Sequence, residues 1–249
     1  MKVNLIHHES CLDTLKKLDD DSIDLTITSP PYNMNLRIRY GKYTSRQIIK
    51  EEFSTKYDNF DDNLPLDEYN KFHSSVLEEL IRVSKLVFYN TQLVTGSKRS
   101  MFKMIGDYGE YLKDRVVWDK GYGQPAMQSG VMNSRFEDIY IFEKEYPISR
   151  MFKRSYFDRG TLDNVWSIPR PRNNDGTNLA TFPEELVEKI LENFSVDNDV
   201  VYDPFMGTGT TALVASRMGR RYIGSEISKE YIKIANDRIK NDHKQLELA

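Results

Sequence analysis

Apolar and polar side chains follow two periods along the chain, and these predict its strands and helices. Residues 22–28 alternate apolar and polar positions, which is typical of a strand with one face towards a core. Residues 66–85 repeat apolar side chains every third or fourth position, as an amphipathic helix does. The same criteria predict further strands at 4–7, 86–89, 115–118, 138–142, 199–203 and 221–224, and further helices at 11–18, 97–109, 182–194 and 211–218. This alternation predicts an α/β, Rossmann-like fold: a mostly parallel twisted sheet with helices on both faces and an antiparallel edge hairpin.

Two long segments, 33–66 and 145–172, show neither period. The first is basic and then acidic, and is interpreted as a surface lid loop; the second is irregular and contains several prolines. Loops of such length are usually functional. Between them and the last elements, Thr181-Phe-Pro-Glu184 has the spacing of a capping box, so the next helix is expected to start there.

The composition is that of a folded domain. The 249 residues include 39% hydrophobic and 12% aromatic side chains, enough for the core of one large α/β domain. No stretch approaches the roughly 18 apolar residues of a membrane span, and the amino terminus has no apolar run typical of a secretion signal. The single cysteine, Cys11, allows neither an internal disulfide nor a cysteine metal cluster. A cytoplasmic protein without a membrane or a metal site is therefore expected.

Charge is distributed unevenly along the chain. The net charge of −3 argues against attraction of nucleic acid by the chain as a whole. Residues 35–50 nevertheless contain five bases and no acid, and residues 146–172 contain six bases against two acids. These two segments are either solvated loop surface or contacts for phosphate groups.

Residues 203–211, Asp-Pro-Phe-Met-Gly-Thr-Gly-Thr-Thr, form a glycine turn between a predicted strand and a predicted helix, where open α/β sheets bind ligands. A phosphate-binding loop would need a lysine before the final hydroxyl residue, and none is present. Gly207 and Gly209 also fit the dinucleotide pattern G-x-G-x-x-A, with Glu226 as a ribose-binding acid 19 positions after Gly207. A third interpretation is a nucleoside that carries an amino acid, and Asp203 favours it because a carboxylate can pair with an ammonium group. A plain tight turn is the structural alternative.

The sequence Ser29-Pro30-Pro31-Tyr32 also follows a predicted strand. Neither proline can donate to a sheet ladder, so the strand ends there and the backbone is held rigid. The Ser29 side chain and the Pro30 carbonyl then become fixed acceptors beside an aromatic face, which suits a planar ring bearing an amino group. On these four residues alone, a purely structural turn is the alternative.

Together the two motifs resemble those of the DNA amino-methyltransferases, which transfer a methyl group from S-adenosyl-L-methionine to an exocyclic amino group. The family's catalytic motif, (D/N/S)-P-P-(Y/F), is matched by residues 29–32, and its cofactor motif, D-P-F-x-G-x-G-T-T, by residues 203–211. The A-T-F-P-E-E-L sequence at 180–186 is similar to a further cofactor motif. A catalytic motif that precedes the cofactor motif is the permuted, β-type order. The resemblance implies one catalytic domain over residues 1–249, with 145–172 as an inserted target-recognition region.

The resemblance also assigns roles by position. Many relatives have Gly-Asp-Cys near the amino terminus, with the Asp on the adenine of the cofactor; this chain has Glu9-Ser10-Cys11, and Cys11 is expected to pack in the core or beside the cofactor. The implied catalytic residues are Ser29, Pro30, Pro31 and Tyr32. The implied cofactor-binding residues are Glu9, Ser10, Cys11, Thr181, Phe182, Asp203, Pro204, Phe205, Gly207, Thr208, Gly209, Thr210, Thr211 and Glu226. The DNA-binding candidates in the basic segments are Arg37, Arg39, Lys42, Arg150, Lys153, Arg154, Arg159, Arg170 and Arg172.

The implied reaction is methylation of a base flipped out of double-stranded DNA, without a covalent enzyme intermediate. Serine in the first motif position favours cytosine N4, and adenine N6 is the alternative. Relatives often dimerise, so a homodimer is one candidate assembly, and a companion restriction endonuclease is a candidate partner; the sequence leaves both open. The competing hypotheses are an NAD-dependent oxidoreductase, a catalytically silent DNA-binding protein and an RNA methyltransferase. The methyltransferase hypothesis requires the loops at 29–32 and 203–211 to open side by side into a common cavity, and not to lie on opposite edges of the sheet.

Overall fold

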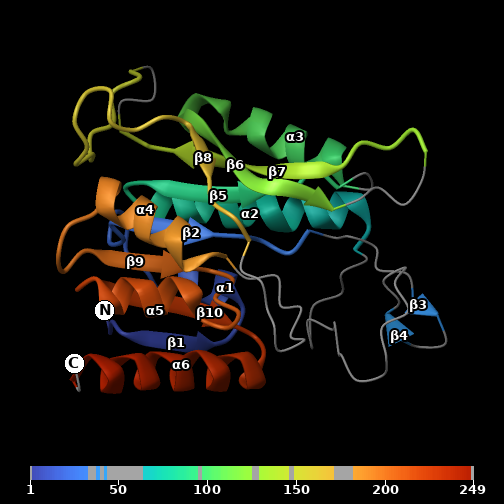
Figure 1. The fold of residues 1–249 in the computed structure, drawn as a ribbon. Coiled ribbons are helices and arrows are strands. Elements are labelled where there is room, and N and C mark those ends of the chain that lie inside the picture. Colours follow the sequence, from blue (N-terminus) through green and yellow to red (C-terminus); the bar gives the residue numbers. More distant parts are fainter. Residues whose placement is uncertain are drawn as a thin grey trace.

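A computed structural model of the chain describes residues 2–32, 64–94, 97–124, 129–145, 149–170 and 182–247, and the backbone of 38–39 and 42–43. Eight of its strands form one sheet in the order β1-β10-β9-β2-β5-β7-β6-β8 (Figure 1). These strands are β1 (Leu5–His8), β2 (Leu25–Thr28), β5 (Val87–Thr91), β6 (Leu112–Gln124), β7 (Ser134–Phe142), β8 (Val165–Ser167), β9 (Val200–Asp203) and β10 (Arg221–Glu226). A separate ribbon pairs β3 (Ile38–Arg39) with β4 (Lys42–Tyr43).

The parallel part of the sheet comprises β1, β10, β9, β2 and β5, so the carboxyl ends of these five strands share one edge. We call it the carboxyl edge, and the opposite one the amino edge. Strand β7 is antiparallel to β5, β6 is antiparallel to β7, and β8 is parallel to β6. The predicted α/β fold is confirmed. The antiparallel hairpin of β6 and β7 was expected to end the strand order. Strand β8 takes that last position, because it pairs with the outer side of β6.

Helices cover both faces of the sheet (Figure 1). They are α1 (Cys11–Leu15), α2 (Leu66–Val83), α3 (Lys98–Asp107), α4 (Glu184–Phe194), α5 (Thr210–Arg217) and α6 (Lys229–Glu247), with a 3-10 turn, η1 (Gly109–Tyr111). One face packs against α1, α2 and α3, and the other against α4, α5 and α6. Successive side chains of a strand point to opposite faces. Accordingly, Phe88 of β5 lies in the core under α4, whereas Val87 and Tyr89 lie in the core under α2.

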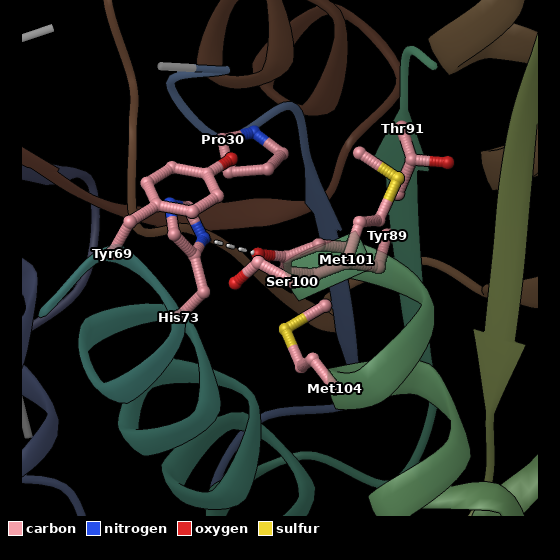
Figure 2. A pocket seen from close by; sticks show the side chains of 8 residues that line it. All are labelled: Pro30, Tyr69, His73, Tyr89, Thr91, Ser100, Met101 and Met104. Carbon is pink, nitrogen blue, oxygen red and sulfur yellow. Dashed lines mark hydrogen bonds between the residues drawn. The ribbon is translucent and has the colours of Figure 1, made fainter. Parts of the chain in front are cut away.

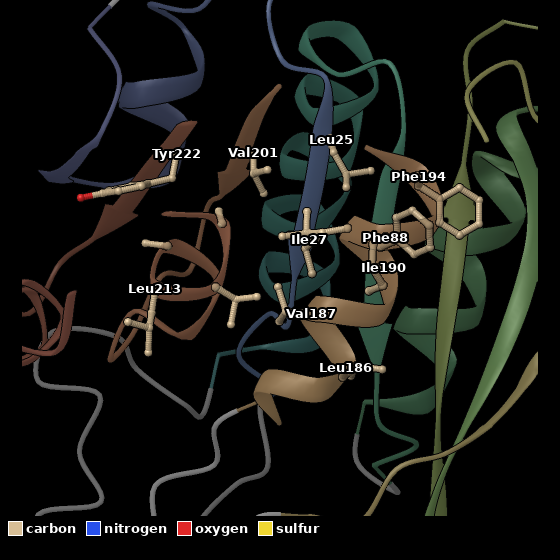
Figure 3. Close-up of a cluster of buried hydrophobic side chains, with 14 of the residues drawn as sticks. Leu25, Ile27, Phe88, Leu186, Val187, Ile190, Phe194, Val201, Leu213 and Tyr222 are labelled. Atoms are coloured by element: carbon tan, nitrogen blue, oxygen red, sulfur yellow. The ribbon is translucent and has the colours of Figure 1, made fainter. Parts of the chain in front are cut away.

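The core under α4 shows why the apolar stripe of that helix forms (Figure 3). Leu186, Ile190 and Phe194 recur every fourth residue and are almost fully buried against the sheet. The rings of Phe194 and Phe88 pack edge to face with centroids 5.0 Å apart. Full burial of a large apolar side chain contributes about 1.5–3 kcal/mol, so this stripe holds α4 firmly on the sheet.

Two predicted details are wrong. Helix α4 begins at Glu184 after an extended Pro183, so no capping box spans 181–184. The Glu184 carboxylate instead binds Arg217 at 2.8 Å and Arg238 at 3.2 Å, and Thr181 lies outside the described residues. In addition, β6 is much longer than predicted and β8 is absent from the prediction. Lysines buried against acids interrupt the apolar pattern of β6, and three residues are too few to show a period.

Candidate active site

The two motif loops leave neighbouring strands at the carboxyl edge. Strand β2 runs into residues 29–32 and β9 runs into residues 204–209, and the two strands pair in parallel. Thr28, the last residue of β2, donates a hydrogen bond from Oγ1 to Oδ1 of Asp203, the last residue of β9, at 2.9 Å. These side chains are 175 positions apart in the sequence. The expectation that the loops lie side by side is therefore confirmed, and a common cavity between them stays a prediction.

Asp203 joins three parts of the site. Besides the bond from Thr28, its carboxyl group accepts hydrogen bonds from the backbone N–H of Phe205 at 3.0 Å and from Thr211 Oγ1 at 2.8 Å. The side chain is buried, and burial raises its pKa to about 6. Through these three hydrogen bonds Asp203 holds the glycine turn and the start of α5 against β2. Its contact with an ammonium group stays a prediction.

The glycine turn needs both of its glycines. Gly207 and Gly209 have φ angles of 53° and 84°, in the left-handed region that residues with a Cβ rarely adopt. A Cβ on Gly209 would also lie only 2.5 Å from the Cβ of Ala235 on α6. The turn can therefore bring backbone close to a ligand while α5 and α6 stay in contact.

Glu226 ends β10 and reaches across to the glycine turn. Its Oε2 accepts the backbone N–H of Gly207 at 2.8 Å, and its Oε1 accepts the backbone N–H of Ser228 at 2.8 Å. Burial raises the pKa of this carboxyl group, although the side chain keeps partial exposure. A carboxylate offers about four acceptor positions, so roughly two remain for further donors. These open acceptor positions fit the vicinal hydroxyl groups of a ribose, which would donate to them.

The residues after β1 lie at the same edge, because His8 is paired with Glu226 in the parallel register of β1 and β10. Glu9 accepts hydrogen bonds from Lys17 and Thr14, and the Lys17 ammonium holds the pKa of this carboxyl group below its usual range. Cys11 is buried, and burial raises the pKa of its thiol to about 12. A neutral, enclosed thiol is consistent with the packing role predicted for Cys11.

The remaining cofactor candidates divide by exposure. Pro204, Thr208, Thr210 and Thr211 are buried in the loop or in the first turn of α5, whereas Phe182 and Phe205 are partly exposed. The ring of Phe182 packs edge to face on Trp118, with centroids 6.2 Å apart. Of the described residues in this set, these two phenylalanines are the rings that a ligand can reach.

The backbone of the catalytic loop is held from two helices. Tyr69 of α2 donates its hydroxyl to the Pro31 carbonyl, and Ser97, just before α3, donates its hydroxyl to the Tyr32 carbonyl, both at 3.1 Å. The Pro30 carbonyl accepts no hydrogen bond from the described residues. It therefore keeps its acceptor capacity, while the hydrogen bonds to Pro31 and Tyr32 hold the backbone that follows it.

The side chains of this loop meet a polar network that the sequence motifs do not include. The Ser29 and Tyr32 hydroxyl oxygens are 2.7 Å apart, and Asn90 Nδ2 donates to Tyr32 at 2.7 Å. Asn90 also donates to Glu137 at 2.7 Å, and Glu137 binds Lys120 at 3.1 Å. The one signal in the sequence is the position of Asn90 directly after the apolar run that predicts β5.

A small apolar pocket lies behind the catalytic loop, between α2 and α3. Figure 2 shows Pro30 of the loop, Tyr69 and His73 of α2, and Met101 of α3 around it. His73 Nδ1 is hydrogen-bonded to the Tyr89 hydroxyl at 2.8 Å. Burial lowers the pKa of His73 to about 3, which makes the imidazole a weak base. The imidazole of His73 is therefore held neutral in this pocket.

Most of the described second basic segment lies at the amino edge, away from the motif loops. Arg154 binds Asp24 at 3.2 Å and Asp199 at 2.6 Å, and these acids immediately precede β2 and β9. Phe152 and Phe157 pack against the last residue of α4. These contacts fold residues 152–157 against the amino edge of the sheet, and the role of 145–172 as a target-recognition insertion stays a prediction.

The nine DNA-binding candidates fall into four groups. Arg154 is paired as described, Lys153 pairs with Glu145, and Arg170 pairs with Glu137 near the motif loops. Arg150 and Arg159 are exposed. Arg39 and Lys42 lie in β3 and β4, of which the backbone alone is described, and Arg37 and Arg172 lie outside the described residues, as does most of the 33–66 lid.

Comparison with known proteins decides the family. A family model described as DNA methylase matches residues 23–237. The chain belongs to this family. It is 29% identical to the type II methyltransferase M.BglII of Bacillus subtilis over 94% of this chain and 68% of that protein. It is 25% identical to M1.MboII of Moraxella bovis over 95% of this chain and 96% of that protein.

Solved structures of DNA methyltransferases share the fold of this DNA methylase. The PvuII DNA methyltransferase, described as cytosine-N4-specific, superposes with a TM-score of 0.68 at 19% identity, over 96% of this chain and 91% of that one. M1.HpyAVI in complex with S-adenosyl-L-methionine superposes with a TM-score of 0.61 at 20% identity, over 94% and 98%. The Rossmann-like methyltransferase fold is thus confirmed.

Two kinds of feature are absent from the described residues. None of the helices there combines the length and the apolar character needed to cross a bilayer. No group of three or more His, Cys, Asp or Glu side chains in the same part of the chain could hold a metal ion.

Proposed function

We propose that this DNA methylase transfers a methyl group from S-adenosyl-L-methionine to the exocyclic amino group of a base in double-stranded DNA, with cytosine N4 favoured. The observation that carries the proposal is the hydrogen bond from Thr28 to Asp203, because it brings the catalytic loop and the glycine turn to one point of the sheet. Ligands of open α/β sheets bind at the carboxyl ends of the strands, where both loops lie.

The residues around the glycine turn fit the cofactor. Glu226 would accept the ribose hydroxyl groups with the positions that Gly207 and Ser228 leave open. Glu9 and Ser10 at the end of β1, and the exposed edges of Phe182 and Phe205, would line the adenine. When bound, S-adenosyl-L-methionine supplies a methyl group activated by its sulfonium.

The catalytic loop would prepare the amino nitrogen as nucleophile. An exocyclic amine is weakly nucleophilic because its lone pair is delocalised into the ring. The Pro30 carbonyl and the Ser29 hydroxyl can accept the two N–H groups, which localises the lone pair on nitrogen and aims it at the methyl group. Holding the reacting atoms in line supplies several kcal/mol, about 7–11 kcal/mol at most in well-oriented systems. No covalent intermediate with the protein is required.

The target base would have to leave the duplex to reach this loop. Extrusion costs on the order of a few kcal/mol. Stacking on the Tyr32 ring would offset about 1–3 kcal/mol of that. The hydrogen bond from Asn90 to the Tyr32 hydroxyl holds the ring in one orientation before the base arrives.

Serine at position 29 supports cytosine N4, since aspartate at this motif position is mostly linked to adenine N6 in the family. Adenine N6 is the second candidate, because its amino group and adjacent ring nitrogen present the same pattern to the loop. An oxidoreductase would leave the position of the catalytic loop beside the glycine turn unexplained, whereas a silent DNA-binding protein with the same fold would bind duplex DNA and transfer no methyl group. A homodimer and a companion endonuclease stay predictions.

Nucleoside mass spectrometry tests the proposal. Unmethylated duplex DNA is incubated with the protein and S-adenosyl-L-methionine, digested to nucleosides and analysed. N4-methylcytosine is the expected product, and N6-methyladenine would establish the second candidate. Absence of both, with stabilisation of the protein by NAD and not by S-adenosyl-L-methionine in a thermal shift assay, would refute the function. Single-stranded RNA as acceptor distinguishes an RNA methyltransferase.

A further inference from the structure

We propose that Glu137 and Asn90 are positioning residues of the catalytic loop: Glu137 sets the side-chain amide of Asn90, and Asn90 sets the hydroxyl group of Tyr32. This inference rests on the proposed methyltransferase function and deepens it. Neither residue belongs to the two sequence motifs. Both lie at the carboxyl edge, where β7 begins beside the end of β5.

The network starts at a buried carboxylate. Glu137 Oε1 accepts hydrogen bonds from Lys120 Nζ at 3.1 Å and from Arg170, and its Oε2 accepts from Asn90 Nδ2 at 2.7 Å. Glu137, Lys120 and Asn90 are 4%, 3% and 1% exposed. Lys120 and Arg170 thus both donate to this carboxylate, at a position that water hardly reaches.

From Asn90 the network continues into the catalytic motif. The Nδ2 atom of Asn90 lies 2.7 Å from the Tyr32 hydroxyl and 3.4 Å from Ser29 Oγ. An amide nitrogen has two N–H groups, so one serves Glu137 and the other serves the hydroxyl pair. The position of the Tyr32 ring and the direction of its hydroxyl thus depend on how Asn90 is turned.

Glu137 dictates that orientation. Both oxygens of Glu137 act as acceptors, Oε1 for Lys120 and Arg170 and Oε2 for Asn90, so Asn90 presents its NH2 group and turns its oxygen away. In the part of the chain that the structure describes, Asn90 Oδ1 is buried and has no donor within hydrogen-bond distance. The amide therefore does not take the orientation that would satisfy its own oxygen; it takes the one that the carboxylate imposes. Loss of the charge on Glu137 would release this constraint.

The β6–β7 hairpin carries a second buried pair that serves as a comparison. Lys113 Nζ and Glu143 Oε2 are 2.7 Å apart, with side chains 0% and 3% exposed. The other oxygen of Glu143 accepts the backbone N–H of Lys153, at the amino edge. Buried ion pairs are weak determinants of stability compared with apolar residues of similar size. The two pairs are alike in chemistry and burial, and the pair at Glu137 is the one that contacts the catalytic loop through Asn90.

Matched substitutions in the two pairs separate positioning from stability. Glu137→Gln keeps the size of the side chain and removes its charge; we expect the single-turnover rate of methyl transfer to fall at least tenfold, with affinity for S-adenosyl-L-methionine within twofold by calorimetry. Glu143→Gln should lower the melting temperature similarly and keep the rate within twofold of wild type. A wild-type rate for Glu137→Gln, or equal rate losses in both variants below their melting transitions, would overturn the inference.

A double-mutant cycle tests whether Glu137 acts through Asn90. Asn90→Leu keeps the volume and leaves Glu137 paired with Lys120 and Arg170, so it also reports on the network if Glu137→Gln does not fold. We expect a loss of at least tenfold, and less than a further twofold loss when Glu137→Gln is added. Losses that multiply would overturn the inference. A wild-type protein that methylates no DNA would refute the proposed function and this inference with it, whereas unaffected variants of an active protein refute this inference alone.

Discussion

Replacing Asp203 with asparagine should remove a pH dependence of stability that arises where the two motif loops meet. The side chain is 4% exposed, and burial raises its pKa from 3.8 to about 6 despite the bonds from Thr28, Phe205 and Thr211. Between these two pH values the Asp203 carboxyl group is protonated in the folded chain and ionised in the unfolded chain. Stability from this group is fully present below about pH 4 and is lost as the pH rises through about 6.

The magnitude follows from the two pKa values. A difference of about two units corresponds to about 3 kcal/mol of unfolding free energy, of which about 1.4 kcal/mol falls between pH 5.0 and 7.5. Asparagine keeps an acceptor for Thr28 and Phe205, and the Thr211 hydroxyl can rotate to accept from the new NH2 group. The variant should therefore gain about 1.4 kcal/mol over wild type on going from pH 5.0 to 7.5.

Urea unfolding at the two pH values measures this gain. Trp118 and Trp166 are both buried, so their fluorescence reports the global transition. Asp237→Asn is the charge-matched control. This acid on α6 is exposed and its pKa is lowered by Lys233, so its removal should not alter the change in unfolding free energy between pH 5.0 and 7.5. Thr28→Val should steepen the dependence, because it deletes a hydrogen bond that lowers the pKa of Asp203. If Asp203→Asn and wild type differ in unfolding free energy by the same amount at pH 5.0 and pH 7.5, the reasoning is refuted.

Three further changes test separate parts of the site. Tyr32→Ala should lower methyl transfer about 5- to 150-fold, the equivalent of about 1–3 kcal/mol of base stacking, and leave calorimetric cofactor affinity within twofold; equal loss of both would exclude a stacking role. Cys11 should react with a thiol reagent at neutral pH after unfolding and not before, because it is buried and its pKa is raised to about 12; rapid labelling of the folded chain would contradict this. Arg39→Ala should weaken DNA binding and reduce the salt slope by about one, whereas Arg159→Ala should change neither in a titration over salt concentrations; the reverse order would refute the placement of the second basic segment.

Most of the fold and the two motif loops of the site could be predicted, because they depend on features of a few consecutive residues. The alternation in β2, the stripe of α4 and the proline pair after Thr28 act over a few residues, so they are legible in the sequence. The same holds for Gly207 and Gly209, whose positive φ angles exclude most other residues. The methyltransferase hypothesis predicted that the two loops lie together, and the physical reason they do is that parallel strands leave their carboxyl ends on one edge.

Pairing between distant segments is what the sequence left open. Arg154 and Arg170 look alike as basic residues of one loop, yet Arg154 neutralises acids at the amino edge and Arg170 neutralises Glu137 beside the catalytic loop. Lys120 interrupts the apolar pattern of β6, as a surface residue would, yet its side chain is buried and pairs with Glu137.

The sequence by itself therefore determined the fold class, the family resemblance and the two motif loops, because short-range backbone constraints specify them. The tertiary structure alone decided the network behind the loop and which charges face water. A side chain such as Asn90 meets Tyr32 and Glu137 only after strand order and register are set, and no spacing along the chain encodes that meeting.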